Sequence, residues 1–270
     1  MKPQKTARGS GDNEDATPLL LAIDVSNTGI KFGLYPLRRQ LDEHNAEDDL
    51  RARWRIATVR EKTTDEYAML LAQLCQHAGV RLADIGDVIL ASVVPVLTPV
   101  FQELATRYIG REAIVVTHET PLGVPLLTDN PWETGADRIL SALAAYSRYG
   151  GPAIVIQFGT ATSFDCVSAE GAFLGGAIAP GMGISAEALA RAASRLYSVE
   201  LTPPPAALGT NTAHSMQSGI VFGHVGLVEG LVARLRSEIP GGAQAQVIAH
   251  GGLADLMARV TPCIDVVDSN

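Results

Sequence analysis

The chain has 270 residues, of which 47% are hydrophobic, 19% charged and 5% aromatic. This composition is typical of a folded globular protein and excludes a collagen, a coiled coil and a wholly disordered chain. The 29 acidic and 21 basic side chains give a formal net charge of -8, which disfavours sequence-independent binding to nucleic acid or to anionic lipid. Cys75, Cys166 and Cys263 stand far apart with no C-x-x-C pair, so we interpret them as buried thiols rather than disulfide or zinc ligands.

The first 17 residues are polar, with three basic and three acidic side chains and almost no apolar content. We expect them to form a disordered tail, because they cannot bury enough surface to offset the entropy of being ordered. No apolar run approaches the roughly 18 residues of a membrane span, and the N-terminus lacks the apolar core of a secretory signal. We therefore expect a cytoplasmic protein that neither enters a membrane nor contacts nucleic acid directly.

A hairpin is predicted directly after the tail. Residues 19–24 form an apolar run, the turn-prone Ser26-Asn27-Thr28 follows, and residues 30–35 resume strand-like side chains. Residues 38–53 are dense in charges of both signs, which suits an exposed hairpin extension. Residues 54–58 then return as a third strand.

Strands and helices alternate in the remainder of the chain. Apolar residues at helical spacing predict helices over 64–78 and 134–150, and residues 88–94 are typical of a buried strand. This alternation predicts an α/β protein with mixed sheets.

The chain also resembles itself. Residues 20–35 and 153–168 each contain an apolar strand, a turn of small and hydroxylated residues and a second strand, with Asp24 opposite Gln157. A repeat at about half the chain length indicates two similar domains rather than a solenoid. We predict domains over residues 18–150 and 151–270, with the site in the cleft between them.

The two repeated turns have the residue types of phosphate loops. Asp24 to Lys31 offers backbone N–H groups, Asn and Thr side chains and a lysine to phosphate oxygens, and the Asp24 carboxylate can hold magnesium. This is not a strand-to-helix P-loop, because the chain contains no G-x-x-x-x-G-K-[ST]. Residues 159–162, Gly-Thr-Ala-Thr, would bind the same phosphates from the other side. Either turn alone is typical of an ordinary hairpin, but the pair in equivalent positions favours a nucleotide site.

Several motifs carry a more specific resemblance, in the order IDVSNT, ASVVP, TDNPWETGADR, FGTAT, GGAIAPG, LGTNTAHSMQSG and HGGLA, between Leu20 and about Val267. On these motifs the chain resembles the type III pantothenate kinases of the acetate and sugar kinase, Hsc70 and actin superfamily. The resemblance implies two duplicated ribonuclease H-like domains, an interdomain nucleotide cleft and a homodimer. It also implies ATP-dependent phosphorylation of pantothenate, the first step of coenzyme A biosynthesis.

Site residues follow from the resemblance position by position. The active-site base matches Asp137, and Asp24 would organise magnesium. The substrate-binding positions match Thr128, Gly135, Ala136, Asp137, Arg138 and Thr212. The ATP-binding positions match Asp24, Val25, Ser26, Asn27, Thr28, Gly29, Ile30, Lys31 and Thr160.

Structural interpretations of the same residues stay open at this stage. Thr134 and Asp137 approximate a capping box, and Thr212 could cap a helix over 214–239. Gly175-Gly176 could admit a ligand or simply pack against another strand. Gly219 and three further glycines, at positions 223, 226 and 230, line one helix face and favour close packing, within the chain or in a dimer interface.

Four departures from the family pattern fall in or near the site. Ser26 replaces a glycine, so its Cβ would crowd the phosphate or make the turn less relaxed. Thr128 replaces a tyrosine that helps to hold pantothenate. Gln157 replaces an aspartate that binds a monovalent cation; its amide oxygen can ligate potassium or ammonium but brings no charge. The chain ends at Asn270, so the domain over 151–270 would lack the family's usual closing helix.

These departures leave alternatives beside the pantothenate kinase. One is a kinase for another small hydroxy compound. The other is a catalytically silent homologue that binds nucleotide or acts as a regulator, since the Bvg accessory factors also resemble this family.

Overall fold

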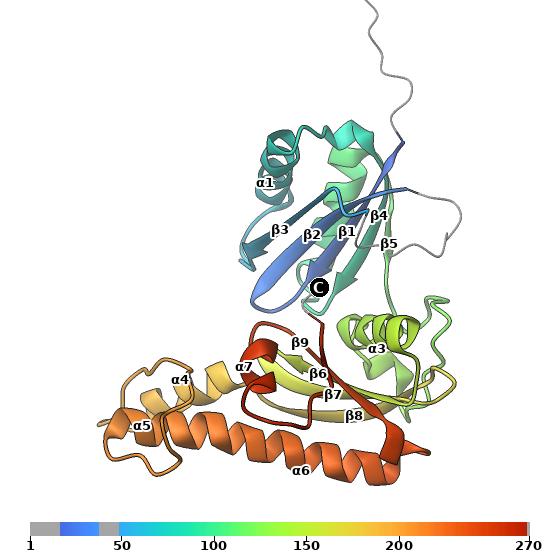
Figure 1. Cartoon of the computed structure of the whole chain (residues 1–270). Coiled ribbons are helices and arrows are strands. Elements are labelled where there is room, and N and C mark those ends of the chain that lie inside the picture. Colours follow the sequence, from blue (N-terminus) through green and yellow to red (C-terminus); the bar gives the residue numbers. More distant parts are fainter. Residues whose placement is uncertain (1–16, 38–48, 269–270) are drawn as a thin grey trace, which may run out of the picture. The chain divides into compact units, whose positions relative to one another are not determined.

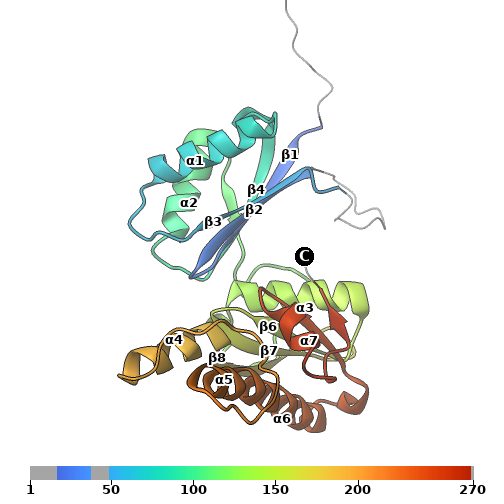
Figure 2. The same cartoon turned by 60° about the vertical axis from the view of Figure 1, so that its left-hand side comes forward.

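The computed structural model describes residues 17–37 and 49–268. Most of the tail predicted for residues 1–17, and residues 38–48 of the predicted hairpin extension, lie outside the described residues. Contacts divide the chain into two compact units, Met1–Val115 and Val116–Asn270. Each unit is built around its own five-stranded sheet (Figures 1 and 2).

The first sheet has the strand order β3-β2-β1-β4-β5. The first three strands form an antiparallel meander, β4 lies parallel to β1, and β5 lies parallel to β4. The predicted hairpin and third strand are therefore confirmed. The bounds are β1 Leu19–Val25, β2 Gly29–Pro36, β3 Ala52–Ala57, β4 Ile85–Ser92 and β5 Ala113–Val115.

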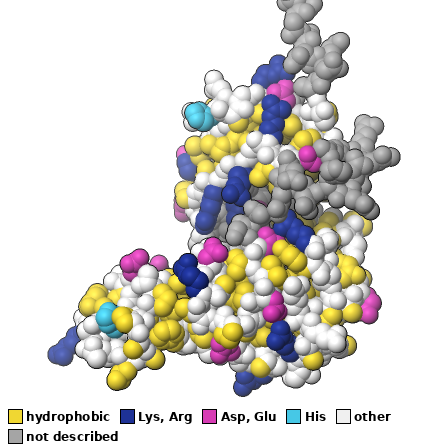
Figure 3. Space-filling view, in the orientation of Figure 1, with side chains coloured by type: hydrophobic (Ala, Val, Ile, Leu, Met, Phe, Trp, Pro, Cys, Tyr) yellow, Lys and Arg dark blue, Asp and Glu magenta, His cyan; other side chains and the backbone are white. Residues whose placement is uncertain are grey.

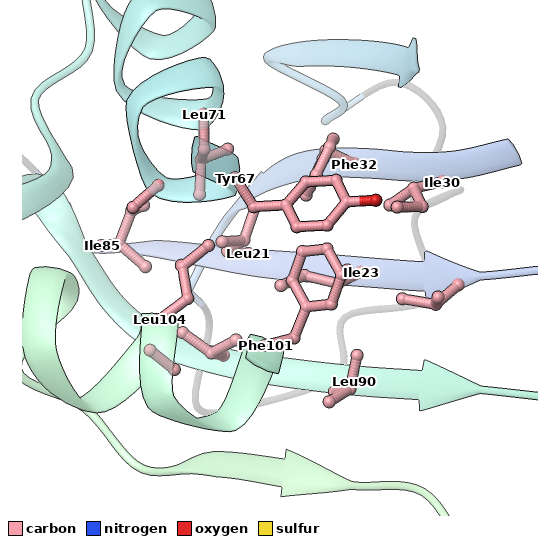
Figure 4. Close-up of a cluster of buried hydrophobic side chains, with 14 of the residues drawn as sticks. Leu21, Ile23, Ile30, Phe32, Tyr67, Leu71, Ile85, Leu90, Phe101 and Leu104 are labelled. Carbon is pink, nitrogen blue, oxygen red and sulfur yellow. The ribbon is translucent and has the colours of Figure 1, made fainter. Parts of the chain in front are cut away.

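Helices cover one face of the first sheet. They are α1 Thr64–His77 and α2 Thr98–Leu104, with a 3-10 turn η1 Leu82–Asp84 and a π-helical turn η2 Ala105–Ile109. Helix α1 begins at a capping box, in which Thr63 accepts from the Glu66 N–H and Glu66 accepts from the Thr63 N–H. Figure 4 shows the core beneath the helices, where the rings of Tyr67 and Phe101 lie 5.0 Å apart.

The second sheet repeats this topology, with the order β10-β9-β6-β7-β8. Strands β6, β7 and β8 form an antiparallel meander, β9 lies parallel to β6, and β10 lies parallel to β9. The sheets therefore match strand for strand, which confirms the predicted internal repeat. The bounds are β6 Ala153–Phe158, β7 Ala161–Val167, β8 Phe173–Pro180, β9 Gln246–His250 and β10 Val266–Val267.

Helices pack on both faces of the second sheet, because successive side chains of a strand point to opposite faces. Val155 and Val167 pack with Ala142 and Ala145 of α3. Phe164, on the other face of the sheet, belongs to the core on the α6 side. The helices are α3 Ala136–Tyr149, α4 Met182–Ala192, α5 Thr212–Gln217, α6 Gly223–Glu238 and α7 Ala254–Ala258, with the shorter turns η3 Pro131–Glu133, η4 Ser218–Phe222 and η5 Gly242–Gln244.

Helix α3 belongs to the second compact unit. Its alanine face lies on β6 and β7, so the division falls between Val115 and Val116. The domain boundary that we predicted from sequence lies after α3, at residue 150. The candidate residues of α3 and of the second sheet therefore belong to one compact unit and can be described together.

The continuous helical segment over α5, η4 and α6 is long and apolar. Thr212–Glu238 is the one helix among the described residues that is long and apolar enough to cross a membrane by length and composition. Core helices of soluble proteins pass the same test, and Val228 and Val232 of this helix are buried in the second core. On its exposed side, a Cβ added at Gly219 or Gly223 would meet no neighbouring element within 4 Å. Close packing on this glycine stripe therefore stays a prediction for a second copy.

Candidate active site

The first candidate phosphate loop is the tight turn between β1 and β2. Ser26 closes this turn, because its N–H and its Oγ both donate to the Gly29 carbonyl, at 3.0 and 2.7 Å. Thr58 Oγ1 donates to the Ser26 carbonyl at 2.6 Å, and Arg60 Nη2 donates to Asn27 Oδ1 at 3.0 Å. Positive φ occurs only at glycines among the described residues. Ser26 therefore fits the turn without a positive φ, which argues against a less relaxed turn, one of the two expected effects of replacing the glycine; crowding of a phosphate by its Cβ stays a prediction.

A row of charged side chains crosses the face of the first sheet opposite α1 and α2. The register pairs Asp24 with Lys31 and Lys31 with Arg55. Lys31 Nζ lies 3.2 Å from Asp24 Oδ2, and both side chains are partly exposed. The Arg55 guanidinium lies over Gly29, where a Cβ would stand 2.8 Å from its Nε. Basic side chains accordingly gather over β2 and β3 (Figure 3), beside a carboxylate of the kind that holds magnesium.

The second candidate phosphate loop joins β6 to β7. The Gly159 N–H donates to the Ala161 carbonyl, and the Gly181 N–H donates to the Thr160 carbonyl, both at 3.0 Å. Just beyond the loop, Thr162 Oγ1 lies 2.9 Å from Nε2 of His224 on α6. Burial lowers the pKa of His224 below its usual 6.5, so the imidazole is neutral at pH 7. Contacts on both sides thus hold the loop that contains Thr160.

The beginning of α3 presents the predicted base. Gly135 is the N-cap and no side chain caps the helix, so the capping box of Thr134 and Asp137 is wrong. Asp137 lies in the first turn, where the partial positive charge of the helix N-terminus favours a carboxylate. Asp137 Oδ1 accepts from the Arg138 N–H at 2.9 Å.

Arg138 reaches from α3 to the second sheet and contacts a buried carboxylate. Its Nε donates to Asp165 Oδ1 at 2.6 Å, and its guanidinium lies 5.3 Å from the centre of the Phe173 ring. Asp165 is completely buried. Burial raises the pKa of Asp165 to about 6, against the opposing effect of Arg138.

Thr128 and two glycines of β8 lie near the contact between Arg138 and Asp165. Asp165 pairs in register with Gly176, and a Cβ on Gly176 would lie 1.6 Å from the Phe164 carbonyl oxygen and 3.3 Å from Arg138 Nη2. Gly175 has a φ of 107°, and its Cβ position lies 3.7 Å from Thr128 Cγ2. Packing therefore explains why Gly176 is glycine, because a side chain there would collide with the Phe164 carbonyl and crowd Arg138.

Thr212 lies on the other side of the second sheet. It is the first residue of α5 and lines a groove of about 980 Å³ between α4 and the α5–α6 segment. The N-cap is Asn211, whose Oδ1 accepts from the His214 N–H at 2.9 Å, so the alternative that Thr212 caps the helix is wrong. Because α3 packs on the opposite face, one chain does not bring Thr212 to Asp137.

Gln157 holds the predicted position in the repeat. It is the penultimate residue of β6, as Asp24 is of β1, and its register partners are Ser163 and His250. No cluster of three or more His, Cys, Asp or Glu side chains suited to a metal occurs in the part of the chain that the structure describes.

Sequence reasoning did not single out Asp165, Arg55 or His224. Asp165 is an acidic residue inside a strand that is buried from Thr162 to Val167, and such a residue requires a partner. That signal was present in the sequence. The positions of Arg55 over Gly29 and of His224 against Thr162 depend on strand register and helix packing, which no local motif reveals.

Comparisons with known proteins identify the family. The family model described as type III pantothenate kinase matches residues 20–234. The type III pantothenate kinase of Moorella thermoacetica is 46% identical over 250 residues, covering 93% of this chain and 94% of its own. That of Roseiflexus castenholzii is 47% identical over 250 residues, covering 93% of both.

Solved structures show the same fold at low sequence identity. A Baf family transcriptional activator from Campylobacter jejuni has a TM-score of 0.55 at 14% identity, with 92% of this chain and 91% of that chain covered. This likeness concerns the fold alone. The family model and the relatives show that this chain belongs to the type III pantothenate kinase family.

Proposed function

We propose that this chain transfers the γ-phosphoryl group of ATP to pantothenate, giving 4'-phosphopantothenate, the first step of coenzyme A biosynthesis. The observation that carries this proposal is the 46% identity to a type III pantothenate kinase over 93% of the chain. The chain also keeps Asp137 and Arg138 at the start of α3, where Arg138 contacts the buried Asp165, and this supports the proposal.

Asp137 is the proposed base. Its carboxylate would accept the proton of the primary hydroxyl as that oxygen attacks the γ-phosphorus. Arg138 would bind a polar or anionic part of the same acceptor, with Gly135, Ala136 and Thr128 lining the site. Phosphoryl transfer depends mainly on positioning and charge neutralisation, so a weak base is sufficient.

The hairpin over Asp24 to Lys31 and the loop at Thr160 are proposed to bind the phosphates of ATP. Asp24 fits a magnesium ion, because magnesium in kinases uses one or two carboxylates together with substrate phosphates and water rather than a cage of protein ligands. When bound, the ion neutralises charge on the phosphates. Lys31, 3.2 Å from Asp24, would then turn towards a phosphate oxygen.

A homodimer is part of the proposal. Thr212 and Asp137 lie on opposite faces of the second sheet, so Thr212 could contact the acceptor only in a site of another copy. The partly exposed Leu189 of α4 lines the same groove as Thr212, and Leu208, shortly before α5, is also exposed. Figure 3 shows hydrophobic side chains over α4 and α5. We propose this side as the dimer surface.

The test is an assay of the purified protein with ATP, magnesium and a panel of hydroxy acids that includes pantothenate, with and without potassium. Phosphorylation of pantothenate well above the rest of the panel is expected. Preference for another acceptor would indicate a divergent kinase. ATP binding without turnover on any acceptor would favour a silent or regulatory homologue.

A further inference from the structure

The Arg138–Asp165 contact is unusual because only one nitrogen of the guanidinium and one oxygen of the carboxylate form a hydrogen bond. A guanidinium and a carboxylate commonly meet through two parallel hydrogen bonds. Here the Nε–Oδ1 bond of 2.6 Å is formed, while Arg138 Nη2 and Asp165 Oδ2 have no hydrogen-bond partner among the described residues, although both atoms are buried. The buried Ser163 hydroxyl, two residues before Asp165 on the same face of β7, acts on the Asp165 carboxylate, but no described residue forms a hydrogen bond with Oδ2. The ion pair thus leaves one buried donor and one buried acceptor without partners.

A third buried polar atom without a hydrogen-bond partner lies near Arg138 and Asp165. Thr128 Oγ1 is buried without a hydrogen-bond partner in the described chain. Its side chain borders Gly175, and Arg138 Nη2 borders Gly176. Asp165 is the register partner of Gly176, so each of the three polar groups borders one of two consecutive glycines of β8.

Buried polar groups are nearly always hydrogen-bonded, and a site that leaves them without partners is costly. A ligand that satisfies this set must accept a hydrogen bond from Nη2 and donate one to Asp165 Oδ2. An amide or an alcohol does both. A carboxylate could accept a hydrogen bond from Nη2, but its negative charge would be repelled by the Asp165 oxygen.

We propose that Asp165 is a specificity-determining residue of the acceptor site: Oδ1 orients Arg138, and Oδ2 accepts a hydrogen bond from an O–H or N–H group of the acceptor. This inference rests on the proposed function. Asp137 is the chain neighbour of Arg138 and its charge acts on Asp165, so an acceptor bound here would have its reacting hydroxyl near the proposed base.

Pantothenate offers two groups of the required kind away from its reacting hydroxyl, the secondary alcohol and the amide N–H. Two analogues separate them: one lacks the secondary hydroxyl, and the other has an ester oxygen in place of the amide nitrogen. Hydrogen bonds to charged groups are the strong ones. The native chain should therefore bind or turn over one of the two analogues about 10- to 100-fold less well than pantothenate.

The variant Asp165→Asn tests which atom makes the discrimination. The asparagine oxygen must still accept from Arg138 Nε, so its NH₂ group would face the acceptor. Asp165→Asn should raise KM for pantothenate about 10- to 100-fold, with a smaller effect on kcat. Its preference for pantothenate over the sensitive analogue should fall to about threefold or less, because the lost hydrogen bond no longer discriminates.

Asp255→Asn, which removes an exposed carboxylate on α7, is the matched control and should keep the native preference. Equal use of pantothenate and both analogues by the native chain would overturn the inference, whether or not Asp165→Asn folds. So would an Asp165→Asn variant that keeps the full native preference.

Calorimetric binding of pantothenate and both analogues separates this inference from the proposed function. Binding without turnover refutes the kinase but still tests Asp165 through the same preferences. A native chain that neither binds nor phosphorylates pantothenate overturns both.

Discussion

Asp137 is the residue on which the proposed chemistry depends most. Its carboxylate lies in the first turn of α3 and accepts from the Arg138 N–H. Asp137→Asn keeps the shape and removes the base, so kcat for pantothenate should fall by about 10²- to 10⁴-fold, with ATP affinity nearly unchanged. Steady-state kinetics and ATP calorimetry measure the two quantities. Turnover within a few-fold of the native value would show that Asp137 is not the base.

The buried Asp165 makes a prediction about stability that is independent of activity. The pKa of Asp165 is raised from 3.8 to about 6 in the folded state. The native state therefore holds this proton more tightly, and the contribution of Asp165 to stability is present below about pH 4 and lost as the pH rises through 6. The loss is about 3 kcal/mol for a shift of this size.

Urea unfolding of the native chain and of Asp165→Asn between pH 4 and 7 measures this effect. The free energy of unfolding of the native chain, relative to the variant, should fall with rising pH. A difference that rises instead would show that the ion pair with Arg138 outweighs burial.

Gln157 predicts how the protein responds to potassium. In the family pattern an aspartate and potassium form a nearly neutral pair beside the phosphates, whereas Gln157 brings no negative charge to repel them. That repulsion would be worth about 1 to 4 kcal/mol at 4 Å for effective dielectric constants of 80 to 20. ATP binding should therefore depend weakly or not at all on potassium, and Gln157→Asp should create a clear dependence. Calorimetry in sodium, potassium and a bulky organic cation decides this; strong dependence in the native chain would refute it.

At the scale of elements, two consecutive residues at the start of α5 have different roles: one is structural and the other is proposed to bind substrate. Asn211 caps the helix, whereas Thr212 is its exposed first residue. Asn211→Ala should lower the free energy of unfolding by about 1 kcal/mol, and Thr212→Ala should leave stability nearly unchanged but raise KM for pantothenate. Equal destabilisation by the two changes would restore Thr212 as a structural residue.

Local patterns predicted the elements well where apolar periodicity was strong. The hairpin of β1 and β2, the helix at 64–78 and the repeat near residue 153 are all present. Capping was predicted less well, because Thr134 and Thr212 each lie one residue from the actual caps, Gly135 and Asn211, and several nearby residue types could serve as caps. Asp165 was missed although an acidic residue in a buried strand signals a partner; that the partner is Arg138 depends on the packing of α3 against β7.

For the whole molecule, the topological repeat argues for duplicated halves, each with a candidate phosphate loop after its first strand. The family resemblance in the motifs is confirmed by the family model and the relatives. The cleft between the halves and the contribution of Thr212 to another copy stay predictions, because they concern relations between compact units and between chains rather than the residues within one unit.

The proposed dimer predicts that native mass and activity change together. Leu189→Asp on α4 places a charge on the proposed dimer surface, where Leu189 is 39% exposed. It should shift the protein to monomer in light scattering and lower pantothenate turnover, with the fold retained. Asp255→Asn on α7 is the control. Full activity in a monomer would contradict the sharing of Thr212.

Product identification tests the central claim most directly. The protein is incubated with pantothenate and γ-¹⁸O-labelled ATP with magnesium, and the products are resolved by mass spectrometry and ³¹P NMR. The account predicts labelled phosphate on the primary hydroxyl of pantothenate, formed by the native chain and formed at least about 10²-fold more slowly by Asp137→Asn. Unmodified pantothenate under conditions where the protein demonstrably binds ATP would contradict it.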